Sequence, residues 1–174
     1  KVLNKREDGY HNIVTLFERI NLFDEIQLRS NQSGAIRIDC DHPQVPKGPK
    51  NLAYKIVRLL QKDLGICKGL EVKIKKCIPV AAGLGGGSSN AATVLLGLNR
   101  IWGLHLSPQQ LLSYARQIGS DVPFFLYDCP WAIGQGRGDI IKKVNIKTRL
   151  WHVLITPRIT LYSQQIYERL SLVA

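Results

Sequence analysis

Cysteine is scarce in this sequence of 174 residues, with four copies at positions 40, 67, 77 and 129. The four do not form a Cys-x-x-Cys pair, and no histidine neighbours them at the intervals typical of zinc ligands. This pattern argues against a zinc site and against a disulfide framework. We therefore expect free thiols in a reducing cytoplasm and no metal-binding residues in the chain itself.

Long apolar runs are missing as well. No uninterrupted stretch approaches the roughly 20 residues of a membrane-spanning helix, and no charged-then-apolar leader opens the chain. Methionine is absent, and the chain starts at Lys1 inside what reads as a strand. We expect no contact with a membrane, and we expect the sequence to be a fragment of a longer protein.

Acidic residues are few, with 13 Asp and Glu against 24 Lys and Arg and a formal net charge of +11. Such a balance suits anionic ligands or a nucleic-acid surface. The basic residues are spread along the chain, and their densest group is Lys73, Lys75 and Lys76. There is no arginine-rich tract and no interleaved ladder of aromatic residues, which single-stranded nucleic acid would need. Small anionic substrates are favoured, and a basic nucleic-acid-binding domain is the alternative from another class.

Apolar residues make up 45% of the chain, enough for one compact domain with a sizeable core. The apolar periodicity changes between two and about 3.6 residues along the chain, which predicts a mixture of strands and helices. Strands before residue 40 are expected to form one small sheet at the start of the domain. Strands are predicted at 1–3, 11–20, 24–29, 35–39, 70–75, 131–134, 139–142 and 151–156, and helices at 52–64, 91–102, 107–118 and 163–170.

The ends of two helices carry recognisable signals. Asn51 stands where the N-cap of the first helix would be, and Gly65 follows its last apolar position. Ser107 and Gln110 are placed for a capping box, with Pro108 at the first helical position.

The stretch from Lys76 to Trp102 organises the rest of the chain. A strand pattern leads into a loop rich in glycine, with glycines at 83, 85, 86 and 87, and the loop leads into an apolar helix pattern. Glycine lets backbone N–H groups approach a bulky ligand, and the first turn of a helix favours a phosphate there. Ser88 and Ser89 would add hydroxyl groups, so the stretch predicts a site for a triphosphate. The alternative, a flexible turn with a serine N-cap, is less favoured because adjacent glycines cost stability and a plain turn needs only one.

Three segments resemble known kinases. Residues 79–92, PVAAGLGGGSSNAA, resemble the ATP loop of the small-molecule kinase superfamily that includes galactokinase, homoserine kinase and mevalonate kinase. Residues 119–125, GSDVPFF, and 6–11, REDGYH, narrow the resemblance to the 4-diphosphocytidyl-2-C-methyl-D-erythritol kinase family of the non-mevalonate isoprenoid route. The loop alone specifies only the superfamily.

The resemblance implies an α+β fold, the ribosomal protein S5 domain 2-like amino-terminal domain of these kinases with its left-handed β-α-β unit. It also implies phosphorylation of the substrate's 2-hydroxyl group by ATP, with Mg²⁺ brought by the nucleotide. Residues 1–156 would be this domain without its first strand, and 157–174 would begin the connection to a carboxyl-terminal domain. The expected setting is the bacterial cytoplasm or a plastid stroma, and the expected state is a monomer or homodimer. Another superfamily kinase, such as homoserine kinase, is the alternative.

The resemblance also assigns residues. Asp121 would orient the acceptor hydroxyl and take its proton, and Tyr10 and His11 would recognise cytosine. The residues implied in ATP binding are Asn51, Lys76, Pro79, Val80, Ala81, Ala82, Gly83, Leu84, Gly85, Gly86, Gly87, Ser88, Ser89 and Asn90.

Each assignment has an ordinary structural alternative. Asp121 could cap a short turn, Tyr10 and His11 could be plain surface residues, and Lys76 could be a solvated charge. The family's catalytic lysine would lie upstream of Lys1, so catalysis by these 174 residues alone is left open.

Overall fold

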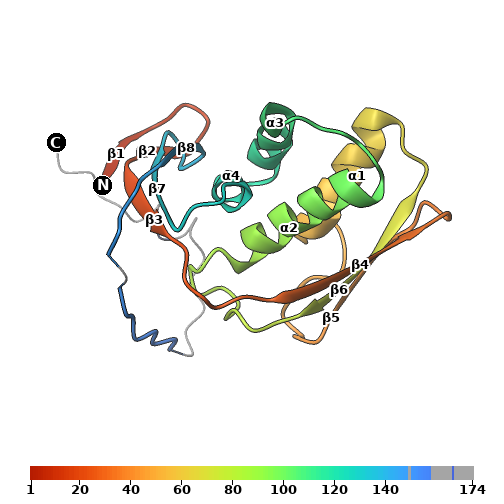
Figure 1. Ribbon diagram of the computed structural model, residues 1–174, viewed down its shortest axis with the longest axis horizontal. Helices are drawn as coiled ribbons and strands as arrows, with labels where there is room; N and C mark the ends of the chain where they lie inside the picture. The colour runs from red at the N-terminus through yellow and green to blue at the C-terminus, as the bar shows by residue number, and fades with distance from the viewer. Residues whose placement is uncertain (149, 158–165, 167–174) are drawn as a thin grey trace.

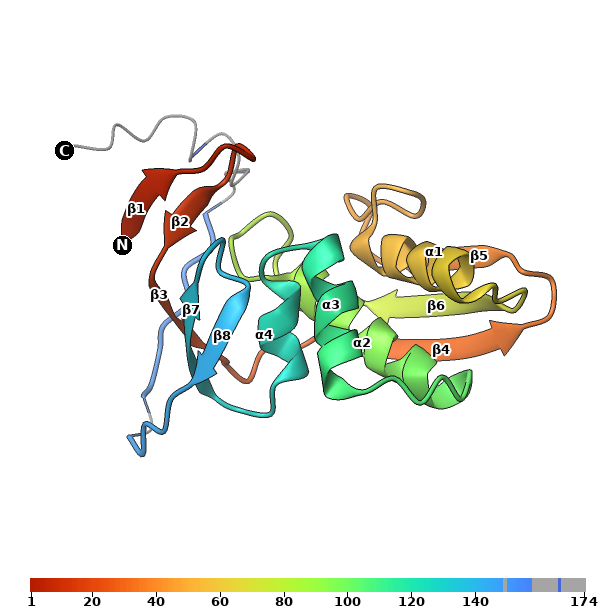
Figure 2. The same ribbon diagram turned by 90° about the horizontal axis from the view of Figure 1, so that it is seen from above.

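The computed structural model describes residues 1–148, 150–157 and 166, and its largest layer is a three-stranded sheet (Figure 1). The sheet has the order β4 (Glu25–Asn31), β6 (Gly69–Lys75), β5 (Ile36–Cys40). β6 runs antiparallel to β4 and parallel to β5. Helices α1 (Leu52–Leu64) and α2 (Gly86–Ile101) lie over one face of this sheet (Figure 2). The parallel strands β5 and β6 joined by α1 form a β-α-β unit.

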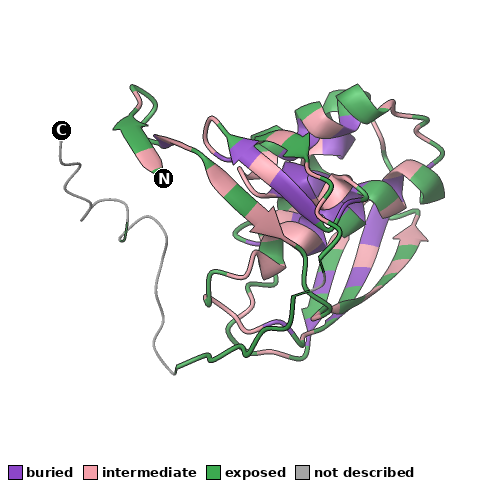
Figure 3. Cartoon of the chain, turned by 60° about the vertical axis from the view of Figure 1, so that its left-hand side comes forward, coloured by how far each residue is buried: buried purple, intermediate pink, exposed green. Residues whose placement is uncertain are grey.

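The core lies between this sheet and its helices, where the buried residues gather (Figure 3). Leu70, Val72 and Ile74 alternate along β6 with more exposed charged residues and are almost fully buried, as their spacing predicts. α2 lies unusually close to β4, because a β-carbon added at Gly97 would be 2.2 Å from Leu28 Cδ1. Only glycine allows this approach, so the position of α2 over the sheet is tightly fixed.

The predicted helix ends are confirmed. The Asn51 side chain accepts the N–H of Ala53 at 2.8 Å, and Gly65 ends α1 in the left-handed conformation with φ +62°. The predicted capping box of Ser107 and Gln110 opens α3 (Pro108–Ile118) with both of its hydrogen bonds in place.

A second sheet has the order β3 (Thr15–Glu18), β7 (Trp131–Gln135), β8 (Ile140–Lys143), with all neighbours antiparallel. The short helix α4 (Val122–Leu126) lies between this sheet and α2 (Figure 2). The ring of Phe124 from α4 stacks on Phe17 from β3 at 4.9 Å between centroids. The segment that begins with Asp121 is therefore packed between the second sheet and α2.

The prediction of one small sheet at the start of the domain is wrong. β1 (Val2–Lys5) and β2 (His11–Ile13) form a separate two-stranded hairpin around the predicted turn, where Gly9 has φ +83°. The predicted strand 11–20 breaks at Val14, and β3 continues into the second sheet. β4 and β5 pair with β6 instead of with the hairpin. The early strands find their partners far along the chain, which local periodicity does not reveal.

The predicted strand at 151–156 is also wrong. Residues 151–157 have no regular secondary structure, and Trp151 and Val153 are each 90% exposed. A strand needs a hydrogen-bonded neighbour, and no described residue pairs with this segment. The predicted helix 163–170 lies outside the described residues except for Ile166.

Two further features can be checked in the described part of the chain. All four cysteines are free thiols, as predicted. Among the described helices, none has the length and apolar character to cross a membrane.

Candidate active site

The glycine-rich loop joins β6 to α2 and has the strand–loop–helix arrangement that the sequence predicts. Ala81, Gly83 and Gly85 take the left-handed conformation, with φ of +55°, +72° and +65°. α2 begins at Gly86, and no side chain caps its first N–H groups. Ser89 is not the cap, because its hydroxyl group donates to the Gly86 carbonyl at 2.9 Å. The positive end of a 16-residue helix is therefore left for an anion.

The glycines of this loop have two structural roles, close packing within the protein and open space at the surface. A β-carbon at Gly85 would be 3.0 Å from the Phe125 ring, and one at Gly86 would be 3.1 Å from the side chain of Ile78. These two positions are filled from within the protein. A β-carbon at Gly83 would meet nothing within 4 Å, and one at Gly87 would meet only Leu52 Cδ1 at 3.8 Å. Gly83 and Gly87 therefore leave open space where a ligand could lie.

Asp121 occupies the N-cap position of α4 but does not cap it. Its backbone is helical, and its side chain makes no capping hydrogen bond. Among the described residues, its hydrogen-bond partner is the Ser120 hydroxyl, which donates to the carboxylate over a long distance of 3.4 Å. Burial raises the pKa of Asp121 above its usual value, and the Ser120 hydrogen bond opposes this only in part. A partly buried carboxylate that is not used as a cap is available for chemistry.

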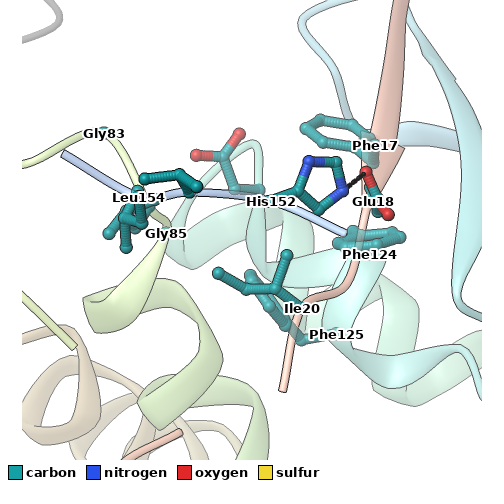
Figure 4. Close-up of a pocket in the computed structure, with 12 residues that line it drawn as sticks. Phe17, Glu18, Ile20, Gly83, Gly85, Phe124, Phe125, His152 and Leu154 are labelled. Carbon is teal, nitrogen blue, oxygen red and sulfur yellow. Dashed lines mark ion pairs between the residues drawn. The ribbon is translucent and has the colours of Figure 1, made fainter. Parts of the chain in front are cut away.

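Asp121 and the glycine loop meet in one open pocket of about 380 Å³ (Figure 4). Its aromatic wall comes from β3 and α4, and the segment with His152 and Leu154 crosses it (Figure 4). His152 Nε2 lies 2.9 Å from a carboxylate oxygen of Glu18. The lining residues are Phe17, Glu18, Ile20, Gly83, Leu84, Gly85, Asp121, Phe124, Phe125, His152, Val153 and Leu154. A group bound here would touch both the loop and the carboxylate.

Tyr10 and His11 lie on the hairpin, outside the lining of this pocket. Tyr10 is half exposed, and the guanidinium of Arg137 lies 4.9 Å from its ring centroid. His11 is buried. The turn between β7 and β8 connects the hairpin to Asp121: Ile13 N–H donates to the Gly136 carbonyl at 2.8 Å, and a β-carbon at Gly138 would lie 4.0 Å from the carboxylate.

Asn51 and Lys76, predicted ATP contacts, both have partners within the protein. The Asn51 amide donates to the Pro46 carbonyl at 2.7 Å while its oxygen caps α1. Lys76 is buried and pairs with Asp24, which rules out the solvated charge that was its alternative. Neither residue lines the pocket. Their contact with a nucleotide stays a prediction.

Sequence reasoning missed two residues near the site, Asp24 and Arg137. Asp24 immediately precedes β4 and accepts hydrogen bonds from residues more than fifty positions away, and Arg137 meets Tyr10 only through the fold. No local pattern marks either residue.

Comparison with known sequences settles the fold family. Residues 51–129 match the family described as "GHMP kinases N terminal domain". The chain contains a GHMP kinase N-terminal domain. A curated relative from Syntrophotalea carbinolica, named 4-diphosphocytidyl-2-C-methyl-D-erythritol kinase, is 45% identical over 98% of the chain. One of the same name from Geobacter metallireducens is 40% identical over 98%. The chain spans 61% and 60% of the length of these two relatives.

Solved structures agree with the GHMP kinase fold. A crystal structure titled 4-(cytidine 5'-diphospho)-2C-methyl-D-erythritol kinase matches with a TM-score of 0.66 at 38% identity, covering 82% of this chain and 50% of that one. Homoserine kinase from Cytophaga hutchinsonii matches with a TM-score of 0.70 at 18% identity, covering 95% and 54%. The second likeness shows the fold alone. The resemblance seen in the three sequence segments is thus confirmed, and the α+β fold prediction with it.

Proposed function

We propose that the protein carrying this domain transfers the γ-phosphate of ATP to the 2-hydroxyl group of 4-diphosphocytidyl-2-C-methyl-D-erythritol, in the bacterial cytoplasm and on the route to isoprenoid precursors. The observation that carries the proposal is the meeting of Asp121 with Gly83 and Gly85 in one pocket. The names of the relatives, at 45% and 40% identity, support the choice of acceptor. Homoserine kinase, an alternative from the sequence, is supported only by a fold likeness at 18% identity.

In this proposal the loop and Asp121 divide the work. The uncapped N–H groups at the start of α2 and the open space at Gly83 and Gly87 hold the phosphates of ATP. Asp121 orients the acceptor hydroxyl and takes its proton as the oxygen attacks the γ-phosphorus, and ADP leaves. A carboxyl with a raised pKa is a better base than an exposed one.

Magnesium fits this site as an ion that enters bound to the phosphates of ATP. Among the described residues, no group of three or more His, Cys, Asp or Glu side chains could hold a metal ion. The pocket does present oxygen ligands from Asp121 and Glu18. Mg²⁺ is commonly bound by one or two carboxylates together with substrate phosphates, where it neutralises phosphate charge.

Tyr10 is proposed to stack on the cytosine, with His11 beside it in the hairpin. We further propose that residues 1–156 form the amino-terminal domain and that 157–174 begin the connection to a carboxyl-terminal one. The relatives are longer than this chain, which supports a further domain in the complete protein.

A pair of glycine variants tests the ATP site. Gly87→Val should fold, because its β-carbon meets only Leu52 Cδ1 at 3.8 Å, while its methyl groups occupy the space above the loop. Gly48→Val is the matched control, since a β-carbon there meets nothing within 4 Å and Gly48 does not line the pocket. Titration of the complete protein with Mg·ATP should show a large loss of affinity in Gly87→Val alone. Equal affinity in both variants and the wild type would remove the ATP site from the proposal.

A further inference from the structure

A buried ion pair lies at the start of the glycine loop. Lys76 Nζ is 3.0 Å from Asp24 Oδ2 and 3.2 Å from Oδ1. The side chain of Lys76 is 5% exposed and that of Asp24 is fully buried. The other ion pairs between β4, β5 and β6 and their surroundings are much more exposed, so this one has a distinct environment.

The Asp24 carboxylate also holds the backbone of the loop. Its Oδ1 accepts the N–H groups of Cys77 at 2.7 Å and Ile78 at 2.8 Å. Lys76 Nζ in turn donates to the Ile78 carbonyl. Asp24 precedes β4, and residues 76–78 follow β6, so one side chain ties the loop to the neighbouring strand of the sheet.

The pair reaches directly under the first turn of α2. A β-carbon at Gly86, the first residue of the helix, would lie 3.1 Å from Lys76 Nζ and 3.1 Å from Ile78 Cγ2. A buried cation at the positive end of a helix is unfavourable unless an anion compensates for it. Asp24 supplies that anion from within the protein.

Asp24 keeps its charge at neutral pH. Desolvation alone would raise the pKa of its carboxyl, but hydrogen bonds from Ile78, Cys77 and Lys76 outweigh it and lower the pKa below its usual value. The carboxylate can therefore act as a fixed negative charge beneath the loop.

We propose that Asp24 is a positioning residue for the nucleotide site: its carboxylate fixes the backbone of residues 76–78 and holds the Lys76 ammonium beneath the first turn of α2. The loop then meets the phosphates in one conformation, and less binding energy goes into ordering it. This inference rests on the proposed function, because it assigns Asp24 to the same ATP site.

The neighbouring pair supplies a matched control. Glu25, the first residue of β4, and Lys75, the last residue of β6, are the sequence neighbours of Asp24 and Lys76. Their charged atoms lie 3.1 Å apart, nearly the separation in the buried pair. Their side chains are 57% and 64% exposed, so Glu25→Gln removes a charge without touching the loop. Surface pairs of this kind contribute little to stability.

The test compares Asp24→Asn with Glu25→Gln in the complete protein. Asp24→Asn should weaken Mg·ATP binding about tenfold, a typical coupling between contacting groups, and should speed amide exchange in residues 77–87 before nucleotide is added. Its affinity for cytidine diphosphate should be unchanged, whereas a general loss of structure would lower both affinities. Glu25→Gln should match the wild type in all three measurements.

A second variant covers the case in which Asp24→Asn, with a lysine left buried and unpaired, does not fold. Asp24→Leu with Lys76→Met buries no charge and should fold, but it offers Cys77 and Ile78 no acceptor. Its loop amides should still exchange faster than those of the wild type. Wild-type exchange in the loop of either variant would overturn the inference. If the wild type itself does not bind ATP, the proposed function is overturned instead. The amide-exchange measurement would still test whether Asp24 orders the loop.

Discussion

Burial makes the charge of Asp121 costly, and the residue has little to offset that cost. Within the part of the chain that the structure describes, Ser120 donates a long hydrogen bond of 3.4 Å to it, and its pKa is raised. A residue that lowers stability and does not cap its helix is better explained by function than by folding.

Asp121→Asn should slow phosphate transfer by about 10²–10⁴-fold, the usual contribution of a general base, while ATP binding survives. The amide keeps the shape of the side chain but cannot accept the proton. Single-turnover transfer in the complete protein measures the loss in the chemical step. Transfer close to that of the wild type would remove the catalytic role of Asp121.

The same variant should be more stable than the wild type at neutral pH. Because the folded pKa of Asp121 is raised, its contribution to stability is complete below the unfolded value near 3.8 and is lost as the pH rises through the folded pKa. The stability gained by the Asn variant should therefore appear at pH values above the folded pKa and vanish at pH values below 3.8. Melting curves of both proteins between pH 3 and pH 8, roughly the range in which carboxyl groups titrate, would show this. A gain that persists unchanged at the acid end would point to a cause other than ionisation.

At the scale of elements, local signals were read correctly from the sequence and distant ones were not. The caps at Asn51, Gly65 and Ser107 involve groups within a few residues, so their spacing is visible in the sequence. The break at Val14 depends on where β3 finds β7, more than a hundred residues on. The same distinction holds for the candidate site. The glycine-rich loop is predicted because its residues are contiguous in the sequence, whereas Asp24 and Arg137 reach the site only through tertiary contacts.

The hairpin of β1 and β2 presents Tyr10 beside Arg137, and a variant can test this arrangement. Tyr10→Ala should weaken the cytidylyl substrate by about 1–3 kcal/mol, as for stacked bases elsewhere, and should leave ATP affinity unchanged. Tyr10→Phe keeps the ring and the contact with the guanidinium, so it is the control. Calorimetric titration with each ligand measures both affinities, and parallel losses for the two ligands would indicate general damage.

Helices α1 and α3 are tied by a hydrogen bond from the Tyr114 hydroxyl to the carboxylate of Asp63. Tyr114→Phe should lower the free energy of unfolding by about 1.5–3 kcal/mol, the range for hydrogen bonds to charged groups.

Desolvation and this bond raise the pKa of Tyr114 to about 12, so the stabilisation should be complete below pH 10 and lost as the pH rises through 12. Urea unfolding at several pH values would measure it. Tyr54→Phe in α1 should have little effect, since its hydroxyl makes no hydrogen bond within the described residues. A loss in Tyr114→Phe no greater than in this control would contradict the tie.

At the scale of the whole molecule, the formal charge of +11 should raise the local concentration of small anions more than it binds polymers. We expect a single-stranded oligonucleotide to compete poorly with ATP at physiological salt. Fluorescence competition at several salt concentrations would measure this, with an uncharged-backbone oligomer as control. Tight oligonucleotide binding with a steep salt dependence would support the nucleic-acid alternative instead.

Among the described residues, the hairpin of β1 and β2 pairs with no strand of the other two sheets, and most of its residues are exposed (Figure 3). By contrast, a β-carbon at Gly85 would lie 3.0 Å from the Phe125 ring, and one at Gly86 would lie 3.1 Å from the side chain of Ile78. Mutations in these two regions therefore face different selection. A substitution at the hairpin tip should lower the stability of the fold only slightly, so it can persist. A substitution at Gly85 or Gly86 should destabilise the fold and be selected against for that reason, whatever its effect on ligand binding. Lineages descended from such a domain would be expected to diversify the acceptor they modify while inheriting the same phosphate donor.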